Sequence, residues 1–338
     1  MSTFDKIFIH SQIKIYKTVR REQTSNSRNI TGCFFYCCRN LRWSETNLIN
    51  MNIYIDAPRE FSLIHTVRSH GWYDLAPFDF DETQATLTHV TIIDDAAVTY
   101  SVCSRSHQLN IEATGGIVSD QVSGAVKRIL RLDEDLFEFY TLTSGQPGLD
   151  WVSQKRAGRL LRSPTVWEDL VKTICTTNCS WSLTKKMVAN LVEKLGSVSA
   201  DGRRAFPSAI AMAAAGPDFY REEIKAGYRS PYLAELSELV ASGKLDPETW
   251  LTWPGTTADL KKEMKKVKGV GDYAAENLLK LLGRYDGLAL DSWLRSGFYK
   301  RHNNEQACPD KTIESHYERF GKWRGLAIWC DLTEYWFE

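Results

Sequence analysis

Apolar and polar residues alternate along residues 85–104 ("ATLTHVTIIDDAAVTYSVCS") and 108–114 ("QLNIEAT"). A period of two with many β-branched residues is typical of half-buried strands. The pattern changes at residues 119–143 ("SDQVSGAVKRILRLDEDLFEFYTLT"), where the spacing of apolar positions predicts one or two helices. The N-terminal half therefore predicts strands followed by helix.

A second pattern lies near the C-terminus, around Gly269 and Gly271. In residues 259–268 ("DLKKEMKKVK") the apolar positions are four and three residues apart, which is a helical period. Residues 272–282 have one apolar face, and Gly283 is a suitable helix stop. The sequence therefore predicts a helix, a tight glycine turn and a second helix.

The backbone N–H groups of such a turn, together with the positive end of the second helix dipole, suit a phosphate. A dinucleotide cofactor is excluded because its fingerprint needs a buried strand before the first glycine, and here a lysine-rich helix precedes it. The Gly-Lys-Ser/Thr of a phosphate-binding loop does not occur either. A DNA phosphate remains, and such a contact reads no base. The alternative without function is an ordinary turn between two helices.

Asp291 follows Gly271 by twenty residues, within "GRYDGLALDSWLRSGFYKRH" at residues 283–302. It stands at a helix N-cap position, ahead of an apolar run. As a cap alone it is worth about 1 kcal/mol.

Taken together, the hairpin, the loop and Asp291 resemble the superfamily of DNA glycosylases that have a helix-hairpin-helix, a Gly/Pro-rich loop and an Asp. The resemblance points to the branch of 3-methyladenine DNA glycosylase II and 8-oxoguanine glycosylase, and it covers about residues 55–338. Further matching segments are residues 163–196, 206–216, 226–243 and 321–332. The Gly-Pro part is degenerate, since Leu288-Ala289 stands where a Pro is common and Lys268 stands where the hairpin often has Pro.

The resemblance implies an α+β fold in three parts. Residues 51–145 form a small antiparallel α/β domain, and residues 146–338 form a mostly α-helical helix-hairpin-helix glycosylase domain. Residues 1–50 have no clear periodicity and no long apolar run, so they are expected to be a poorly ordered N-terminal extension.

The formal net charge of zero argues against a generically basic nucleic-acid binder. The charge is uneven, however: +5 over residues 1–50, −9 over residues 51–150 and +4 over residues 151–338. The helical part is therefore the expected DNA face. Salt-dependent binding is expected from a lysine cluster that comprises Lys261, Lys262, Lys265, Lys266 and Lys268.

By resemblance the chain is a base-excision repair glycosylase that flips a damaged purine out of DNA and hydrolyses its N-glycosidic bond, with Asp291 as the catalytic carboxylate. Bifunctional members carry a lysine where this chain has Tyr273, so it is expected to be monofunctional, without AP-lyase activity. Lys268 and Lys280 do not stand at that position. Two other interpretations stay open: a non-catalytic helix-hairpin-helix DNA-binding protein, and a lyase that uses a displaced lysine.

The remaining site predictions are also carried over by resemblance. The DNA-binding hairpin comprises Lys268, Gly269, Val270, Gly271 and Asp272. Stacking on the flipped base is assigned to Tyr273, Trp181 and Trp329, with Trp293 as a further candidate. Contact with the orphaned base is assigned to Asn178, and Arg203 is the candidate wedge. Aromatic faces favour a cationic alkylated purine, whereas "GYR" and "FPS" resemble the oxidised-guanine branch, so the lesion stays open.

No cofactor is expected to be required. Eight cysteines without a ligand pattern favour a reducing compartment and predict neither an iron–sulfur cluster nor zinc. The resemblance implies that the hairpin could bind a monovalent cation. The expected partner is double-stranded DNA with a damaged base, bound by a monomer, with no membrane. The expected location is cytoplasmic and nucleoid-associated in a bacterium, and the nucleus or an organelle in a eukaryote.

Overall fold

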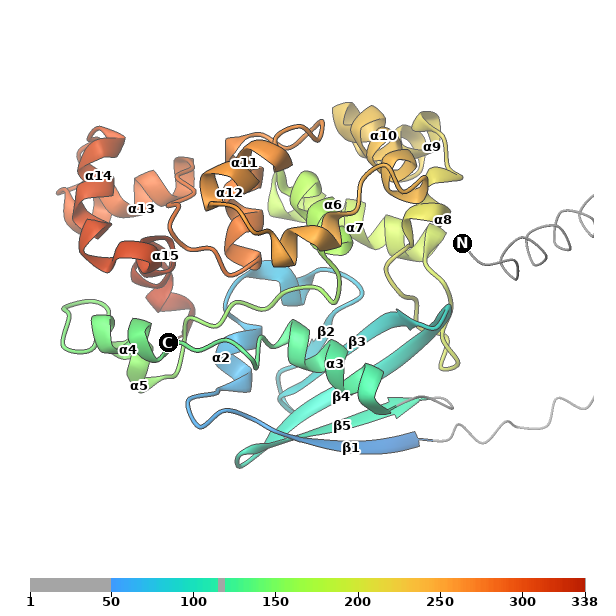
Figure 1. Cartoon of the computed structure of the whole chain (residues 1–338), viewed down its shortest axis with the longest axis horizontal. Helices are drawn as coiled ribbons and strands as arrows, with labels where there is room; N and C mark the ends of the chain where they lie inside the picture. The colour runs from blue at the N-terminus through green and yellow to red at the C-terminus, as the bar shows by residue number, and fades with distance from the viewer. Residues whose placement is uncertain (1–49, 115–118, 338) are drawn as a thin grey trace, which may run out of the picture. The chain divides into compact units, whose positions relative to one another are not determined.

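The computed structural model describes residues 50–114 and 119–337 (Figure 1). The described residues belong to one compact unit, Leu48–Glu338. The prediction of a poorly ordered extension at residues 1–50 lies outside the described residues, except that Asn50 begins the first strand.

Five antiparallel strands form one sheet with the order β1-β5-β4-β3-β2. Their bounds are β1 Asn50–Asp56, β2 Asp79–Asp81, β3 Thr86–Ile93, β4 Ala96–Arg105 and β5 Gln108–Thr114. Asp94 and Asp95 join β3 to β4 in a two-residue turn, and both have positive φ, as tight hairpins require. The alternating segments predicted as strands are therefore confirmed.

Helices make up most of the remaining described chain. The first group is α2 Leu63–Val67, η1 Gly71–Asp74, α3 Ser119–Ile129, α4 Phe137–Thr143, α5 Asp150–Gln154, α6 Val166–Thr176 and α7 Trp181–Leu195. The middle group is α8 Ala209–Ala213, α9 Pro217–Glu222, η2 Gly227–Arg229, α10 Ser230–Ala241 and η3 Pro247–Thr252. The last group is α11 Thr257–Met264, α12 Asp272–Leu281, α13 Ser292–His302, α14 Asp310–Tyr317, η4 Glu318–Trp323, α15 Arg324–Thr333 and η5 Glu334–Phe337.

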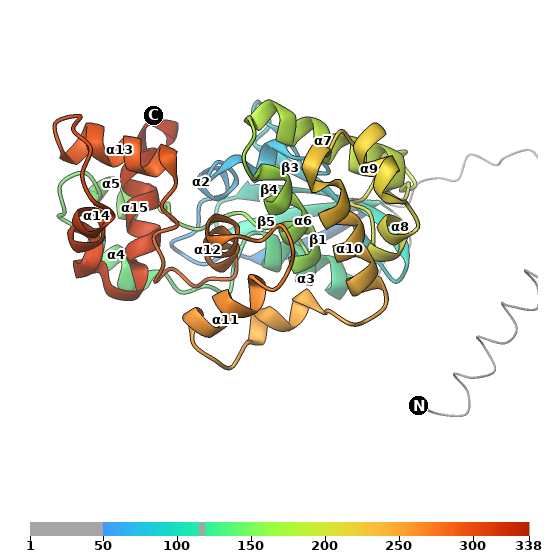
Figure 2. The ribbon, with the colours of Figure 1, turned by 90° about the horizontal axis from the view of Figure 1, so that it is seen from above.

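The chain buries two hydrophobic clusters. The larger lies between the sheet and helices that include α3, α6, α7, α10 and α12. The smaller joins α4 and α5 to the helices α13 to α15. Figures 1 and 2 show α12 between the α13–α15 group and the α6–α10 group, and its buried residues belong to the larger cluster. The α+β class is confirmed, while the domain division at residue 145 stays a prediction.

The helix-turn-helix predicted around Gly269 is α11, a turn and α12. The first helix is shorter than predicted: α11 ends at Met264, so Lys265, Lys266 and Lys268 lie in the turn. Gly269 has a φ of 89°, a value that favours glycine. None of the described helices is both long and apolar enough to span a membrane.

Candidate active site

A cavity with a volume of 810 Å³ lies beside the N-terminal end of α13. Its walls come from distant parts of the sequence: residues 68–74 around η1, the facing sides of α6 and α7, the side of α12, the start of α13, and Trp329 of α15. Pockets of this size that collect residues from several elements are where small-molecule groups bind.

Asp291 is both the N-cap of α13 and part of the cavity wall. Its Oδ1 accepts a hydrogen bond from the backbone N–H of Leu294 at 2.7 Å. Oδ2 accepts none from the residues that the structure describes. One oxygen is therefore fixed by the helix terminus, and the other is available to a group in the cavity.

Trp181, at the start of α7, forms another wall of the cavity. Its Nε1 donates to Asp74 Oδ2 at 2.9 Å, and its ring lies against Gly71. A Cβ at Gly71 would stand 2.4 Å from that ring, so only glycine permits this packing. The indole is thereby held in one position although it is 38% exposed.

Tyr273 and a cluster of tryptophans complete the aromatic lining. Tyr273 is on the first turn of α12, and burial raises the pKa of its hydroxyl. Trp329 donates from Nε1 to the carbonyl of Ser69 at 2.9 Å, and its ring centroid lies 5.9 Å from that of Trp293 and 5.5 Å from that of Trp336. The cavity therefore offers several flat faces of the kind on which a base stacks.

Lys280 also lines this cavity, seven residues after Tyr273 on α12. Seven residues are about two helical turns, so both side chains lie on the same side of the helix. Lys280 is 3% exposed, and its Nζ has no hydrogen-bond partner among the described residues. The ammonium lies 5.3 Å from the ring centroid of Trp329. Burial lowers the pKa of Lys280 from 10.5 to about 8, against the opposing effects of Glu276 and Asp291.

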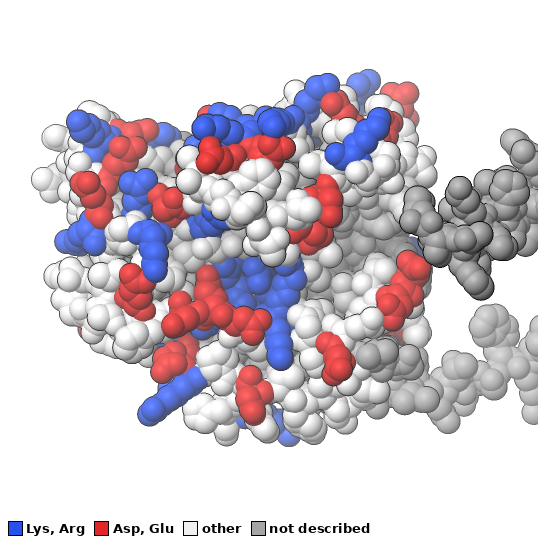
Figure 3. All heavy atoms as spheres, in the orientation of Figure 1, with Lys and Arg blue, Asp and Glu red and all other residues white. Residues whose placement is uncertain are grey.

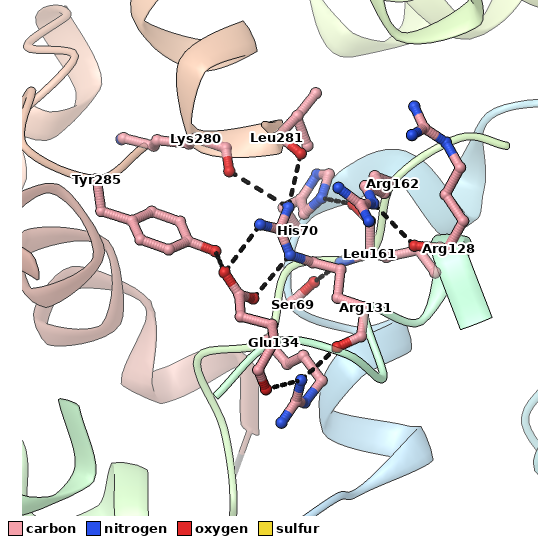
Figure 4. A network of polar contacts seen from close by, with 11 residues as sticks. Ser69, His70, Arg128, Arg131, Glu134, Leu161, Arg162, Lys280, Leu281 and Tyr285 are labelled. Carbon is pink, nitrogen blue, oxygen red and sulfur yellow. Dashed lines mark hydrogen bonds and ion pairs between the residues drawn. The ribbon is translucent and has the colours of Figure 1, made fainter. Parts of the chain in front are cut away.

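A buried polar network fixes the end of α12 (Figure 4). Arg131 donates from Nη1 to the carbonyls of Leu281 at 2.6 Å and Lys280 at 3.4 Å. Its Nε and Nη2 donate to the Glu134 carboxylate at 2.7 and 2.9 Å, which also accepts from the Tyr285 hydroxyl at 2.7 Å. These bonds satisfy carbonyls that a helix end leaves without partners, and they set the position of Lys280.

The hairpin presents free backbone groups away from this network. The N–H groups of Gly269, Gly271 and Asp272 donate to no backbone acceptor in the described part of the chain. Gly271 has a φ of −88°, and an added Cβ would meet nothing within 4 Å. The surface at Gly271 is therefore open to a close approach.

The lysine cluster at the hairpin is neutralised within the protein. Each ammonium is within 3.2 Å of a carboxylate oxygen, in the pairs Lys261–Glu276, Lys262–Asp259, Lys265–Asp272, Lys266–Glu263 and Lys268–Glu235. Figure 3 shows Lys or Arg side chains next to Asp or Glu side chains over α11, along the upper edge. A phosphate would have to replace these carboxylates as partners of the lysines.

Asn178 and Arg203 do not line the cavity. Asn178 is in the turn between α6 and α7 with a φ of 45°, and its Nδ2 donates to the Tyr228 hydroxyl at 3.4 Å. Arg203 is paired with Asp79 of β2 at 2.9 Å. The roles given to both residues stay predictions.

In the described part of the chain, two places offer donor atoms to a cation. In the hairpin, the carbonyls of Lys268, Gly269 and Val270 accept no backbone hydrogen bond from described residues, which fits the predicted monovalent cation. The other place comprises His302, His316 and Asp331. There Asp331 is already paired with Arg301 at 2.9 Å, and the positive guanidinium opposes a metal ion.

The acidic N-terminal segment contributes more to the site than the sequence indicates. No site residue was predicted within residues 51–145, yet His70, Gly71 and Asp74 lie in the cavity wall. Burial lowers the pKa of His70 to about 4, and its Nε2 donates to the Leu161 carbonyl at 2.5 Å. The available signal was "SHGWYD", a glycine among aromatic residues between a helix and a strand pattern.

No protein-family model and no curated protein matches this chain. Solved structures do match it. The 3-methyladenine DNA-glycosylase from Archaeoglobus fulgidus superposes with a TM-score of 0.70 at 19% identity, over 85% of this chain and 99% of that chain. The Clostridium acetobutylicum 8-oxoguanine glycosylase/lyase, solved with double-stranded DNA containing cytosine opposite 8-oxoguanine, gives 0.67 at 20% identity, over 84% and 97%.

MBOgg1, solved with a low-affinity DNA ligand, gives a TM-score of 0.69 at 18% identity, over 84% of this chain and 96% of that chain. The chain thus has the fold of the helix-hairpin-helix DNA glycosylases, as its sequence resemblance predicted. Structures named for 3-methyladenine and for 8-oxoguanine match about equally well, so the fold does not distinguish between the two lesions.

Proposed function

We propose that this protein is a DNA glycosylase that removes a damaged purine from double-stranded DNA by hydrolysing its N-glycosidic bond. The observation that carries the proposal is the position of Asp291. Its carboxylate caps a helix and lines an aromatic cavity, and a glycine hairpin suited to a phosphate precedes it in the chain.

The cavity supports the chemistry in three ways. Cleavage of the glycosidic bond builds positive charge on the sugar, and a carboxylate beside C1′ stabilises that charge. The same carboxylate can take a proton from the attacking water. The faces of Trp181 and Tyr273 can stack on a base that has been flipped out of the duplex, which repays part of the unstacking cost.

The proposal is for hydrolysis rather than lyase chemistry. In the resembling family the lyase amine stands where this chain has Tyr273, and a phenol cannot form an imine with the sugar. A duplex bound at the hairpin would receive hydrogen bonds from the N–H groups of Gly269 and Gly271, with a monovalent cation reducing charge repulsion there. Asn178 would contact the orphaned base, and Arg203 would act as the wedge after leaving Asp79.

The partner is therefore double-stranded DNA with a damaged base, and the protein acts as a monomer. DNA as substrate implies the nucleoid in a bacterium and the nucleus or an organelle in a eukaryote. A non-catalytic DNA-binding protein remains the alternative, and activity on a defined lesion separates the two.

The test is Asp291→Asn on a panel of duplexes, each with one lesion, followed by hot alkali to reveal abasic sites. Asn is as good an N-cap as Asp, so stability should be kept. The amide cannot balance positive charge on the sugar, so the single-turnover rate should fall about 10²–10³-fold.

Asp246→Asn is the matched control, because Asp246 caps η3 by accepting from the Glu248 N–H at 3.0 Å, away from the cavity. It should excise at the wild-type rate. Wild-type rates for Asp291→Asn, or no excision by the wild-type protein on any lesion, would refute the proposal.

A further inference from the structure

Lys280 is a buried charged group in the cavity that the proposed hydrolysis does not use. Buried charges in proteins are normally paired. The other buried lysine in the described chain, Lys172, follows this rule, since its Nζ lies 2.6 Å from Glu168 Oε1. Among the described residues Lys280 has no such partner, so its N–H donors can serve a ligand in the cavity.

We infer that Lys280 decides which damaged bases are excised: it favours uncharged purine lesions that offer hydrogen-bond acceptors, and it disfavours cationic alkylated purines. The inference rests on the proposed glycosylase function and narrows its substrate class. It answers the question that the aromatic lining alone leaves open.

The positive charge of Lys280 opposes the binding of a cationic base. Aromatic faces attract a cationic base, and on the lining alone an alkylated purine would be favoured. However, the Lys280 ammonium already lies 5.3 Å from the centroid of the Trp329 ring. The protein's own cation therefore uses this ring, and a second positive charge in the same cavity would be repelled.

The charge of the leaving base also differs between the two classes of lesion. When C1′–N9 breaks in an uncharged purine, the electron pair goes to the base, which leaves as an anion. A cationic alkylated purine leaves as a neutral molecule and needs no such help. An N–H donor of Lys280 can stabilise the developing anion and give it a proton, while Asp291 takes a proton from the water that adds to C1′. The proton then returns from Asp291 to the amine, so the sum is the addition of one water.

The charge state of Lys280 depends on its surroundings. Glu276 on its own helix, Asp291 before α13 and Cys330 on α15 each raise the pKa of the amine, while burial lowers it to about 8. His70 faces the same cavity from the N-terminal segment, and burial lowers its pKa to about 4, so it is neutral near pH 7. The ammonium form thus predominates at pH 7, and excision of an uncharged lesion should decline as the pH rises above about 8.

The experiment compares single-turnover excision of 8-oxoguanine, hypoxanthine and 7-methylguanine from matched duplexes, with spontaneous loss of 7-methylguanine subtracted. The wild-type protein should prefer at least one of the two uncharged lesions. Lys280→Met, which keeps the size and removes the charge, should slow that lesion about 10²-fold. The rate on 7-methylguanine should stay the same or rise.

Lys244→Met is the control, because Lys244 is exposed and lies outside the cavity. It should leave both rates unchanged. Wild-type preference for 7-methylguanine, or an equal loss on all lesions in folded Lys280→Met, would overturn the inference. The wild-type preference is a test that does not depend on the folding of any variant.

Three outcomes separate this inference from the proposed function. If the wild-type protein excises nothing, both fail. If it excises a lesion in a manner that needs Asp291, and Lys280→Met leaves the ratio of rates unchanged, only the inference fails. A covalent adduct with DNA that is trapped by borohydride in the wild-type protein and absent in Lys280→Met would show that the amine attacks the sugar. That result would overturn both the hydrolytic mechanism and the base-selecting role.

Discussion

Lysines lie at both ends of α12, in the hairpin turn before it and near its last residue, and their surroundings are opposite. At the turn, Lys266 and Lys268 have side chains that are 71% and 63% exposed, and each is paired with a carboxylate. At the far end of α12, Lys280 is 3% exposed and has no hydrogen-bond partner among the described residues. Exposed ion pairs contribute little and exchange partners readily, whereas a buried lone ammonium has a large effect on any group beside it.

This comparison gives the two ends different tasks. The paired lysines can exchange carboxylates for phosphates, which suits a contact that depends on charge and not on base identity. Lys280 lines the cavity, so a base bound there would meet its ammonium group, whether that base is charged or uncharged. Each of the following variants changes one end of α12. A variant at the turn should leave the cavity unchanged, and a variant at the cavity should leave the turn unchanged.

The largest effect is expected from Arg131→Met, at the cavity end. Arg131 donates hydrogen bonds to the Glu134 carboxylate and to the carbonyls of Lys280 and Leu281. Removing one partner of a buried ion pair leaves an uncompensated charge, so the free energy of unfolding should fall by about 3–5 kcal/mol. Urea unfolding measures it, with Lys127→Met on the exposed side of α3 as the control. A loss close to that of the control would mean that Arg131 does not hold the end of α12.

A smaller effect is expected at the hairpin, where the two glycines differ. Gly269 has a φ of 89°, and an added Cβ would stand 3.1 Å from the Tyr232 ring. Gly269→Val should therefore lower the free energy of unfolding by about 1–2 kcal/mol or more. Gly271 has a φ of −88° and open space around it, so Gly271→Val should keep the fold.

Gly271→Val should nevertheless weaken binding to every duplex alike, because its side chain would stand between the free N–H groups and a phosphate. A side chain at 271 does not strain the turn, because the position with positive φ is 269. Thermal melting and gel-shift titration separate the two variants. Unchanged duplex affinity in Gly271→Val would exclude a phosphate contact at this turn.

The smallest effect is expected from Lys268→Met, measured as the salt dependence of binding to undamaged duplex. If Lys268 leaves Glu235 to contact one phosphate, the slope of log Kobs against log[salt] should decrease in magnitude by about 0.9. Lys280→Met should leave this slope unchanged, because a buried residue meets no phosphate. A change of slope in Lys280→Met, with none in Lys268→Met, would reverse the comparison.

Local patterns predicted the elements well and their ends less well. The strands β3, β4 and β5 follow from an alternation of apolar and polar residues that depends only on neighbouring positions. The cap at Asp291 depends on a contact within four consecutive residues, from Asp291 to Leu294. The end of α11 was placed at residue 268, four residues too late. Lysines are good helix formers, so their presence did not show where the turn begins.

The candidate site was predictable only in part. Tyr273, Trp181 and Trp329 lie in the same cavity as Asp291, whereas Asn178 and Arg203 lie outside it. The roles of all these residues remain predictions. Gly71 and Asp74 were missed because their contact is with Trp181, more than a hundred residues later in the chain, and no local pattern records such a contact.

The sequence by itself determined the strands of the N-terminal part, the glycine turn and the capped aspartate, because each depends on interactions among residues close together in the chain. Only the tertiary structure decided that Lys280 lies in a cavity with no hydrogen-bond partner among the described residues, and that Arg131 meets the end of α12, 150 residues away. Helical periodicity shows that a position is on a buried side, but not whether that side faces packed side chains or a cavity. Whether a cavity lies there depends on which distant segments meet around the position. The protonation state of Lys280 depends on the same segments.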